Sequence, residues 1–228
     1  MLAFVKAMAL GITHLETDVH ATLDGIAVIC HDADLKRIAG RDVRVDQLTL
    51  AELRRIDLGD GQTFSTLSEL LEAFPECRFN IDIKSMAAAA PASAAIIRAN
   101  AVKRVLITSF NDKRRRAATD RMPGVATSAS APSFVAAFIA ARIGLAGLSR
   151  FALRHVDAVQ IPERIALFRT VTPRTVRIFH SAGVEIHVWT VNSAASMRRL
   201  FTHGVDGIFT DRADIAVTVL AELTENSS

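Results

Sequence analysis

The sequence predicts an α/β protein with the architecture of a TIM (β/α)8 barrel, folded as one domain over residues 1–228. The main observation is a hydrophobic pattern that changes repeatedly between short runs of strand length and longer segments of helical period. A strand followed by a helix many times over is typical of a parallel sheet covered by helices. A doubly wound open sheet is the competing architecture, but no G-x-G-x-x-G follows any of the strands.

The second observation is the number of strands. Seven runs are candidate parallel strands, whereas a closed barrel needs eight, and the chain opens with a helix. The simplest account is a barrel whose first strand is apparently missing from this polypeptide. The seven candidate strands begin at His14, Arg78, Arg104, Val125, Asp157, Glu185 and Gly207.

Turn and capping residues set the boundaries of the elements. The first helix stops at Gly11, Thr49 and Glu52 have capping-box spacing, and Pro173 opens a helix in its first turn. The predicted order is helix 2–9, strand 14–19, strand 26–30, helices from 49 and over 65–74, strand 78–84, helix 91–101, strand 104–109, helix 112–121, strand 125–128, helix 132–147, strand 157–161, helix 173–183, strand 185–191, helix 193–201, strand 207–210 and helix 214–223.

Composition indicates a folded globular chain. Half of the residues are hydrophobic and 22% are charged, which excludes a disordered or low-complexity protein. The formal net charge is +3, and no run of Lys and Arg is long enough to follow a row of phosphates, so we expect no nucleic-acid partner. Cys30 and Cys77 lie in or beside apolar runs and are interpreted as small buried side chains.

No segment has the features of a signal peptide, so the chain as given is expected to be cytoplasmic, although upstream sequence would change this prediction. The longest apolar tract, Phe134 to Leu148, is interrupted by Arg142 and is too short to span a bilayer. We interpret it as a buried or barrel-covering helix in preference to a lipid-contacting patch, so membrane contact is possible but not favoured. Oligomeric state is not determined by the sequence.

The first candidate site residues are Glu16 and Asp18. They are two apart on one strand, so both side chains point to the same face. Two such carboxylates repel each other, and a hard divalent cation such as Mg²⁺ or Ca²⁺ between them would remove the repulsion. A surface strand with exposed acids is the alternative interpretation.

A second candidate is His31, which follows the apolar run that ends at Cys30 and precedes Asp32. A histidine at the end of a buried strand is suited to proton transfer or metal ligation, and the aspartate can orient it. The alternative is a structural histidine in a turn. A thiol nucleophile with His31 as its base is disfavoured, because neighbouring residues of a strand point to opposite faces.

Two further strand ends carry candidate residues. Asp82 and Lys84 share one face, and they form either a simple ion pair or a third metal ligand beside a phosphate-binding ammonium. Trp189 is the only tryptophan and lies near the end of a later strand, either in the core or as the apolar wall of a pocket.

Taken together, these segments resemble the glycerophosphodiester phosphodiesterase family, which has a TIM-barrel fold. The resemblance extends from about Met1 to Asp214, and several motifs in the same order make it specific. The motifs are LETDVHATLDG at 15–25, His31-Asp32, FNIDIKS at 79–85, TSF at 108–110, HVWTVN at 187–192 and GVDGIFTDR at 204–212.

The resemblance implies roles for these residues. It implies metal binding by Glu16 and Asp18 and proton transfer by His31. It also implies that Asp82 is the third metal ligand. The family commonly has Glu at this position, and the side chain of Asp is one methylene shorter. Lys84 falls on the family's lysine, and Trp189 is expected to contact substrate. The implied reaction is hydrolysis of a glycerophosphodiester to sn-glycerol 3-phosphate and an alcohol with Mg²⁺ or Ca²⁺.

One departure concerns the start of the chain. The family begins with a strand that bears H-R-G, whose histidine is a second acid/base, and Met1 falls inside the helix that follows. Either the protein starts further upstream, or this is a shortened form without that histidine. The alternative function is therefore a truncated, catalytically impaired barrel that binds metal and phosphodiester without turnover.

Overall fold

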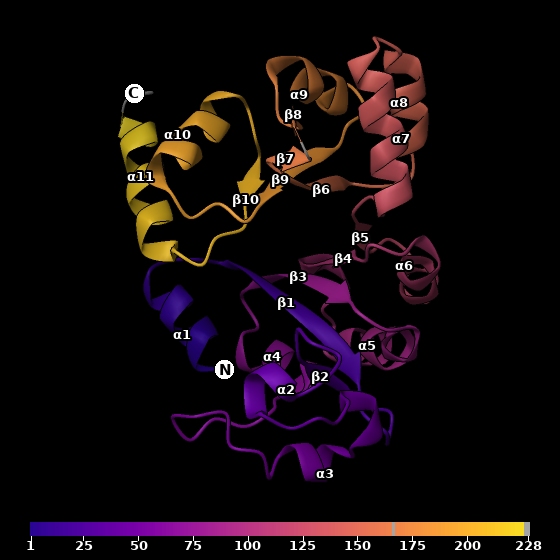
Figure 1. Cartoon of the computed structure of the whole chain (residues 1–228), viewed down its shortest axis with the longest axis vertical. Coiled ribbons are helices and arrows are strands. Elements are labelled where there is room, and N and C mark those ends of the chain that lie inside the picture. The colour runs from indigo at the N-terminus through magenta and orange to yellow at the C-terminus, as the bar shows by residue number, and fades with distance from the viewer. Residues whose placement is uncertain (166, 226–228) are drawn as a thin grey trace. The chain divides into compact units, whose positions relative to one another are not determined.

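The computed structural model describes residues 1–165 and 167–225 (Figure 1). Its internal contacts group the chain into two compact units. The first contains Met1–Met8 and Thr13–Ala126, and the second contains Ala9–Ile12 and the chain from Thr127 onward. A single domain over residues 1–228 stays a prediction.

The first unit is built on a sheet with the strand order β2-β1-β3-β4-β5. β1 pairs in parallel with β3, and β3 pairs in parallel with β4, so that Asp18, Asp82 and Thr108 lie side by side across three strands. β2 pairs with the end of β1 in the antiparallel sense. The strands span β1 (His14–Ala21), β2 (Ala27–Ile29), β3 (Arg78–Ile83), β4 (Val105–Thr108) and β5 (Ala126–Thr127).

Six α-helices accompany this sheet: α1 (Leu2–Ala9), α2 (Lys36–Ala39), α3 (Leu50–Leu53), α4 (Leu67–Ala73), α5 (Met86–Arg98) and α6 (Asp112–Thr119). The capping box at Thr49 is confirmed, and a second one lies at Thr66. The prediction for α5 is wrong at its start, since the helix begins at Met86 and contains Pro91. Ser85 accepts a hydrogen bond from the Ala88 amide, and a run of alanines favours the helix before the proline.

The two faces of the sheet differ in chemistry. Residues at odd positions of β1 and β3, such as Val19, Ile81 and Ile83, are fully buried. Even positions carry the polar side chains, and parallel register places those of the two strands on the same face. One face is therefore packed as core, while the other presents carboxylates at the carboxyl ends of the strands.

The second unit contains a parallel sheet with the order β10-β9-β6 and an antiparallel hairpin of β7 and β8. Phe134, Phe179 and Val188 are among the residues of its apolar core. The elements are α7 (Ala131–Arg142), α8 (Ala146–Leu153), β6 (Ala158–Pro162), β7 (Arg164–Ile165), β8 (Phe168–Arg169), α9 (Pro173–His180), β9 (Glu185–Trp189), α10 (Ala194–Thr202), β10 (Gly207–Ile208) and α11 (Ala213–Glu225).

The single helix predicted over 132–147 is wrong. α7 ends at Arg142 and α8 begins at Ala146, and Gly144 between them has a φ of 90°, which favours glycine. The two helices lie side by side (Figure 1). Within residues 1–165 and 167–225, no helix is long and apolar enough to cross a membrane.

All seven expected strands are present, and the chain has the predicted α/β class. The pairing of β2 and the β7–β8 hairpin were not predicted. Among the described residues the parallel strands form separate sheets, and closure into a complete barrel is not seen.

Candidate active site

The carboxyl ends of β1 and β3 bring together residues that are distant in the sequence. Asp18 is the register partner of Asp82, and Glu16 is that of Asn80. All four side chains belong to the polar face of the sheet. The carboxyl ends of parallel strands are where α/β barrels carry their functional groups, so this edge is the candidate active site.

Lys84 lies between two of these carboxylates. Its Nζ is 2.7 Å from Asp18 Oδ1 and 2.7 Å from Asp82 Oδ2. Burial lowers the pKa of the ammonium, but the hydrogen bonds to both carboxylates outweigh this effect, and the pKa lies above its ordinary value. The cation that relieves the repulsion of these carboxylates is thus supplied by the chain itself.

Asp82 is the most buried member of the group, with 9% of its side chain exposed. Burial raises the pKa of its carboxyl group, and the hydrogen bond from Lys84 opposes this shift. Its Oδ1 is buried and has no hydrogen-bond partner among the described residues. A buried carboxylate oxygen left in this state is costly, and it is a ready acceptor for a cation or a donor that enters the site.

Glu16 is exposed and lies on the same face, two residues before Asp18 along β1. Together with Asp18 and Asp82 it offers the hard oxygen donors that Mg²⁺ and Ca²⁺ prefer. As they stand, no three His, Cys, Asp or Glu side chains within the described ranges are close enough together to hold a metal ion. Asp18 and Asp82 contact Lys84 instead.

His31 follows β2 in a loop, and 65% of its side chain is exposed. Its Nδ1 is 2.6 Å from Asp32 Oδ1, and Arg37 Nε donates to Asp32 Oδ2 over 2.6 Å. These bonds hold the pKa of Asp32 below its usual range, with the His31 contact as the larger cause. Because an ionised carboxylate only accepts, Nδ1 carries the proton and Nε2 is left to exchange a proton with a substrate.

The disfavoured thiol–histidine pair does not form. Cys30 is buried, and its Sγ donates to the Asp32 carbonyl over 3.2 Å. Burial raises the pKa of this thiol to about 11. A thiol with such a pKa carries almost no nucleophilic thiolate near neutral pH.

Two further residues lie at this site, His20 and Arg114, and neither was predicted from the sequence. His20 continues the alternation of Glu16 and Asp18 on β1, is buried, and has no partner for Nε2 among the described residues. Burial is the main cause that lowers its pKa, and the positive charge of Lys84 adds to this effect. Arg114 Nη1 donates to the Lys84 carbonyl from α6. The period-two pattern was a signal for His20, whereas Arg114 had none.

Trp189 ends β9 in the second unit and is partly buried. Its contact with substrate stays a prediction.

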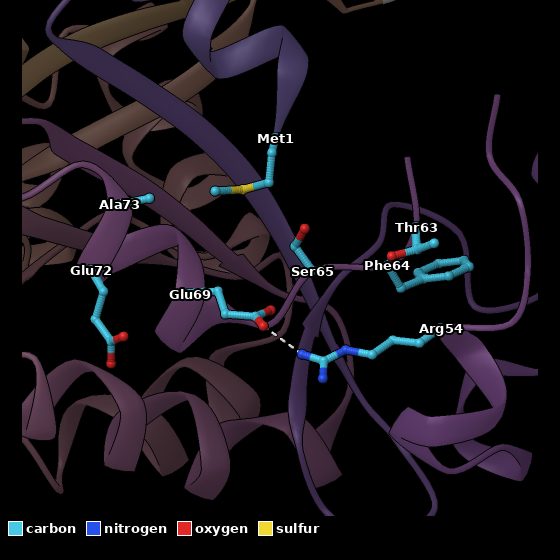
Figure 2. Close-up of a pocket in the computed structure, with 8 residues that line it drawn as sticks. All are labelled: Met1, Arg54, Thr63, Phe64, Ser65, Glu69, Glu72 and Ala73. Atoms are coloured by element: carbon cyan, nitrogen blue, oxygen red, sulfur yellow. Dashed lines mark hydrogen bonds and ion pairs between the residues drawn. The ribbon is translucent and has the colours of Figure 1, made fainter. Parts of the chain in front are cut away.

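An open pocket of about 570 Å³ lies elsewhere in the first unit (Figure 2). Arg54 and Glu69 form an ion pair of 2.5 Å across one side of it. None of the predicted site residues lines this pocket. The pocket-lining residues are Met1, Arg54, Thr63, Phe64, Ser65, Glu69, Glu72 and Ala73.

Comparison with known proteins identifies the family of the chain. The model of the glycerophosphoryl diester phosphodiesterase family matches residues 1–215. The chain belongs to this family. It is 43% identical over 221 residues to the protein named "Probable glycerophosphodiester phosphodiesterase 2" of Mycobacterium tuberculosis, covering 96% of this chain and 84% of that protein.

Solved phosphodiesterases have the same fold. A phosphodiesterase of Oleispira antarctica, crystallised with the product sn-glycerol 3-phosphate, matches with a TM-score of 0.79 and 22% identity over 96% of this chain and 89% of that one. A glycerophosphodiester phosphodiesterase of Agrobacterium tumefaciens matches with a TM-score of 0.78 and 21% identity over 95% and 90%. These neighbours are TIM-barrel enzymes, so the predicted fold class is confirmed.

Membership of the glycerophosphoryl diester phosphodiesterase family makes the chain a phosphoric diester hydrolase. The family acts on glycerophosphodiesters, and its members generally depend on a divalent metal ion. The residues of this chain fit such an ion in their chemistry, since the polar face provides three carboxylates and Asp82 Oδ1 is an unpaired buried acceptor.

Proposed function

We propose that this phosphodiesterase hydrolyses glycerophosphodiesters to sn-glycerol 3-phosphate and an alcohol, with Mg²⁺ or Ca²⁺ as cofactor. The observation that carries the proposal is the contact of Lys84 with Asp18 and Asp82 at the carboxyl ends of two paired parallel strands. It concentrates three charged groups where this fold performs chemistry.

Glu16, Asp18 and Asp82 would hold the divalent ion through carboxylate oxygens. When bound, that ion supplies charge that offsets the negative charge developing on the phosphoryl oxygens. Asp82 is suited to this role by its unpaired Oδ1, because ligation would satisfy an oxygen that is now buried without a partner.

Lys84 would hold a phosphoryl oxygen of the substrate. An ammonium has three N–H donors, and the two ion pairs use two of them, so one donor remains for the substrate. The pKa above its ordinary value keeps the group charged throughout the neutral range. Since Lys84 is mostly buried and held at both sides, its position is fixed before the substrate arrives.

His31 would transfer the proton. With Nδ1–H bound to Asp32, the free Nε2 accepts a proton from the attacking oxygen or, once protonated, donates one to the leaving alcohol. Asp32 fixes the tautomer, and Arg37 fixes Asp32 in turn. The exposed histidine is accessible to a substrate that enters from solvent.

The proposal is tested by hydrolysis of glycerophosphocholine in chelator-treated buffer with and without added Mg²⁺ or Ca²⁺. We expect metal-dependent release of choline, and loss of that activity in Glu16→Ala and Asp18→Ala without unfolding. Asp42→Ala is the matched control, since Asp42 is an exposed acid outside the strands that carry the site. Activity equal to that of the unchanged protein in both site variants would overturn the metal assignment.

A second candidate function is binding of metal and phosphodiester without turnover. The feature that favours it is Lys84, which already neutralises part of the charge of the Asp18 and Asp82 pair without a metal. Equilibrium dialysis with glycerophosphocholine separates the two functions. Binding with no choline release over many hours at high enzyme concentration would select the second function.

A further inference from the structure

The second unit exposes a large apolar surface that the catalytic proposal does not use. Eight large apolar side chains of α7, α8, their connection and the β7–β8 hairpin are each at least 45% exposed. We call them the apolar patch. Its members are Val135, Ile139, Ile143, Leu145, Leu148, Phe151, Leu167 and Phe168.

α7 is apolar on both of its sides. Its inner side packs Phe134 and Phe138 into the core of the second unit, and Phe134 contacts Phe179 edge to face at 6.4 Å between ring centres. Its outer side presents Val135 and Ile139. A helix that is apolar all around is normally buried or in contact with lipid, so its outer side lacks a partner in this structure.

The hairpin adjoins the end of α7. The Arg142 guanidinium lies 5.1 Å from the ring centre of Phe168, and Leu167 beside it is 88% exposed. On α8, the Arg154 guanidinium lies 3.7 Å from the ring centre of Phe151. A third arginine, Arg174, lies so close to the α7–α8 turn that a Cβ at Gly144 would be 2.8 Å from its Nη2. The patch is thus interspersed with arginines.

The segment of the second unit that carries the patch is basic. Residues 127–184 contain seven arginines, no lysine and only two acids. Both acids are engaged, since Asp157 Oδ2 accepts from the Thr127 amide and Glu163 pairs with Arg199 at 2.8 Å. The arginines are Arg142, Arg150, Arg154, Arg164, Arg169, Arg174 and Arg177.

We propose that the apolar patch docks this enzyme on the surface of an anionic membrane. Apolar side chains would enter the boundary between headgroups and acyl chains, while the arginines contact anionic headgroups. The attachment is peripheral, because no helix among the described residues is able to span a bilayer.

Charge selects the lipid surface over a second copy of the chain. In a two-fold symmetric dimer the same patch faces itself, so arginines would meet arginines. The segment has no unengaged acid to pair with them. A surface of negative charge with an apolar interior complements both features of the patch.

The test is sedimentation with vesicles of phosphatidylcholine alone and of phosphatidylcholine mixed with phosphatidylglycerol. We expect binding to the mixed vesicles that weakens as salt is raised. The double variant Leu148→Glu with Phe151→Glu should lose at least about 100-fold in partitioning, about tenfold for each apolar side chain. Arg142→Gln with Arg154→Gln should lose about 25-fold, about fivefold for each charge.

The control variant is Ile97→Glu on α5, because Ile97 is an exposed apolar residue of the first unit and lies outside the apolar patch, and it should bind as the unchanged protein does. Unchanged circular dichroism shows that the variants are folded. Absence of sedimentation with either vesicle, equal binding to both vesicles, or unaltered binding of the Leu148/Phe151 variant would each overturn the proposal. A concentration-dependent dimer that this variant dissociates, without vesicle binding, would assign the patch to a second copy instead.

Discussion

Replacement of Lys84 by methionine tests the central feature of the site. Methionine keeps the length of the side chain and removes the ammonium that contacts Asp18 and Asp82 at 2.7 Å each. The exposed fractions of the side chains are 22% for Lys84, 14% for Asp18 and 9% for Asp82. Without the ammonium, the two carboxylates would therefore face each other with little solvent to screen their repulsion. Removal of one partner from a buried ion pair costs about 3–5 kcal/mol.

We expect about 3 kcal/mol, the lower end of that range, because Asp18 retains some contact with water. For a protein of this size this corresponds to a fall in melting temperature of about 6–12 °C. The measurement is urea unfolding of both proteins in metal-free buffer, with Lys103→Met as the control, since Lys103 is an exposed lysine.

The loss of stability caused by Lys84→Met should increase as the pH rises. Burial already raises the pKa of Asp82, and without the hydrogen bond from Lys84 its pKa rises further. An acid whose pKa is raised by folding is tolerated when protonated, so the variant should be closest to the unchanged protein near pH 5 and furthest from it near pH 8. Equal stability of the two proteins at pH 8, or a difference that does not change with pH, would refute the assigned role of Lys84.

Three other outcomes are expected. His31→Gln should lower the rate of hydrolysis by a factor of about 10² to 10⁴. The melting temperature should change little, because the side chain is mostly exposed, and a clear fall in melting temperature would contradict this expectation. Thr66→Ala should lower the free energy of unfolding by about 1 kcal/mol while the rate is kept, since it removes the cap of α4 but no site contact. Cys30 should react slowly with Ellman's reagent from pH 7 to pH 9 because burial raises its pKa to about 11, whereas rapid labelling of two thiols in the folded protein would contradict the burial of Cys30 and Cys77.

The sequence was sufficient for features that depend on local pattern. Period-two alternation correctly placed Glu16 and Asp18 on one face of a strand, and capping-box spacing correctly placed the start of α3 at Thr49. These features involve residues within a few positions of each other. Their geometry follows from backbone periodicity and local hydrogen bonds.

Features that depend on long-range pairing were beyond the sequence. The contact of Lys84 with Asp18 requires the register of β1 against β3, which no local pattern specifies. The break between α7 and α8 also escaped prediction, because Gly144 and Gly147 lie in an apolar run in which either glycine suits a helix end. The start of α5 was predicted at Pro91, five residues too late, because proline usually lies in the first turn of a helix, whereas Ser85 is the cap.

The contacts of Lys84 also have a mechanical consequence. Its amide donates to the Val19 carbonyl over 3.0 Å, the last bond of the ladder between β1 and β3, and its ammonium then reaches Asp18 on the neighbouring strand. One residue therefore clamps the two strands by backbone and side chain at the same point. The ends of paired strands ordinarily fray, and amides there exchange quickly with solvent. We therefore expect the amides at this edge of the sheet to exchange slowly, with opening motions starting in the loops beyond it.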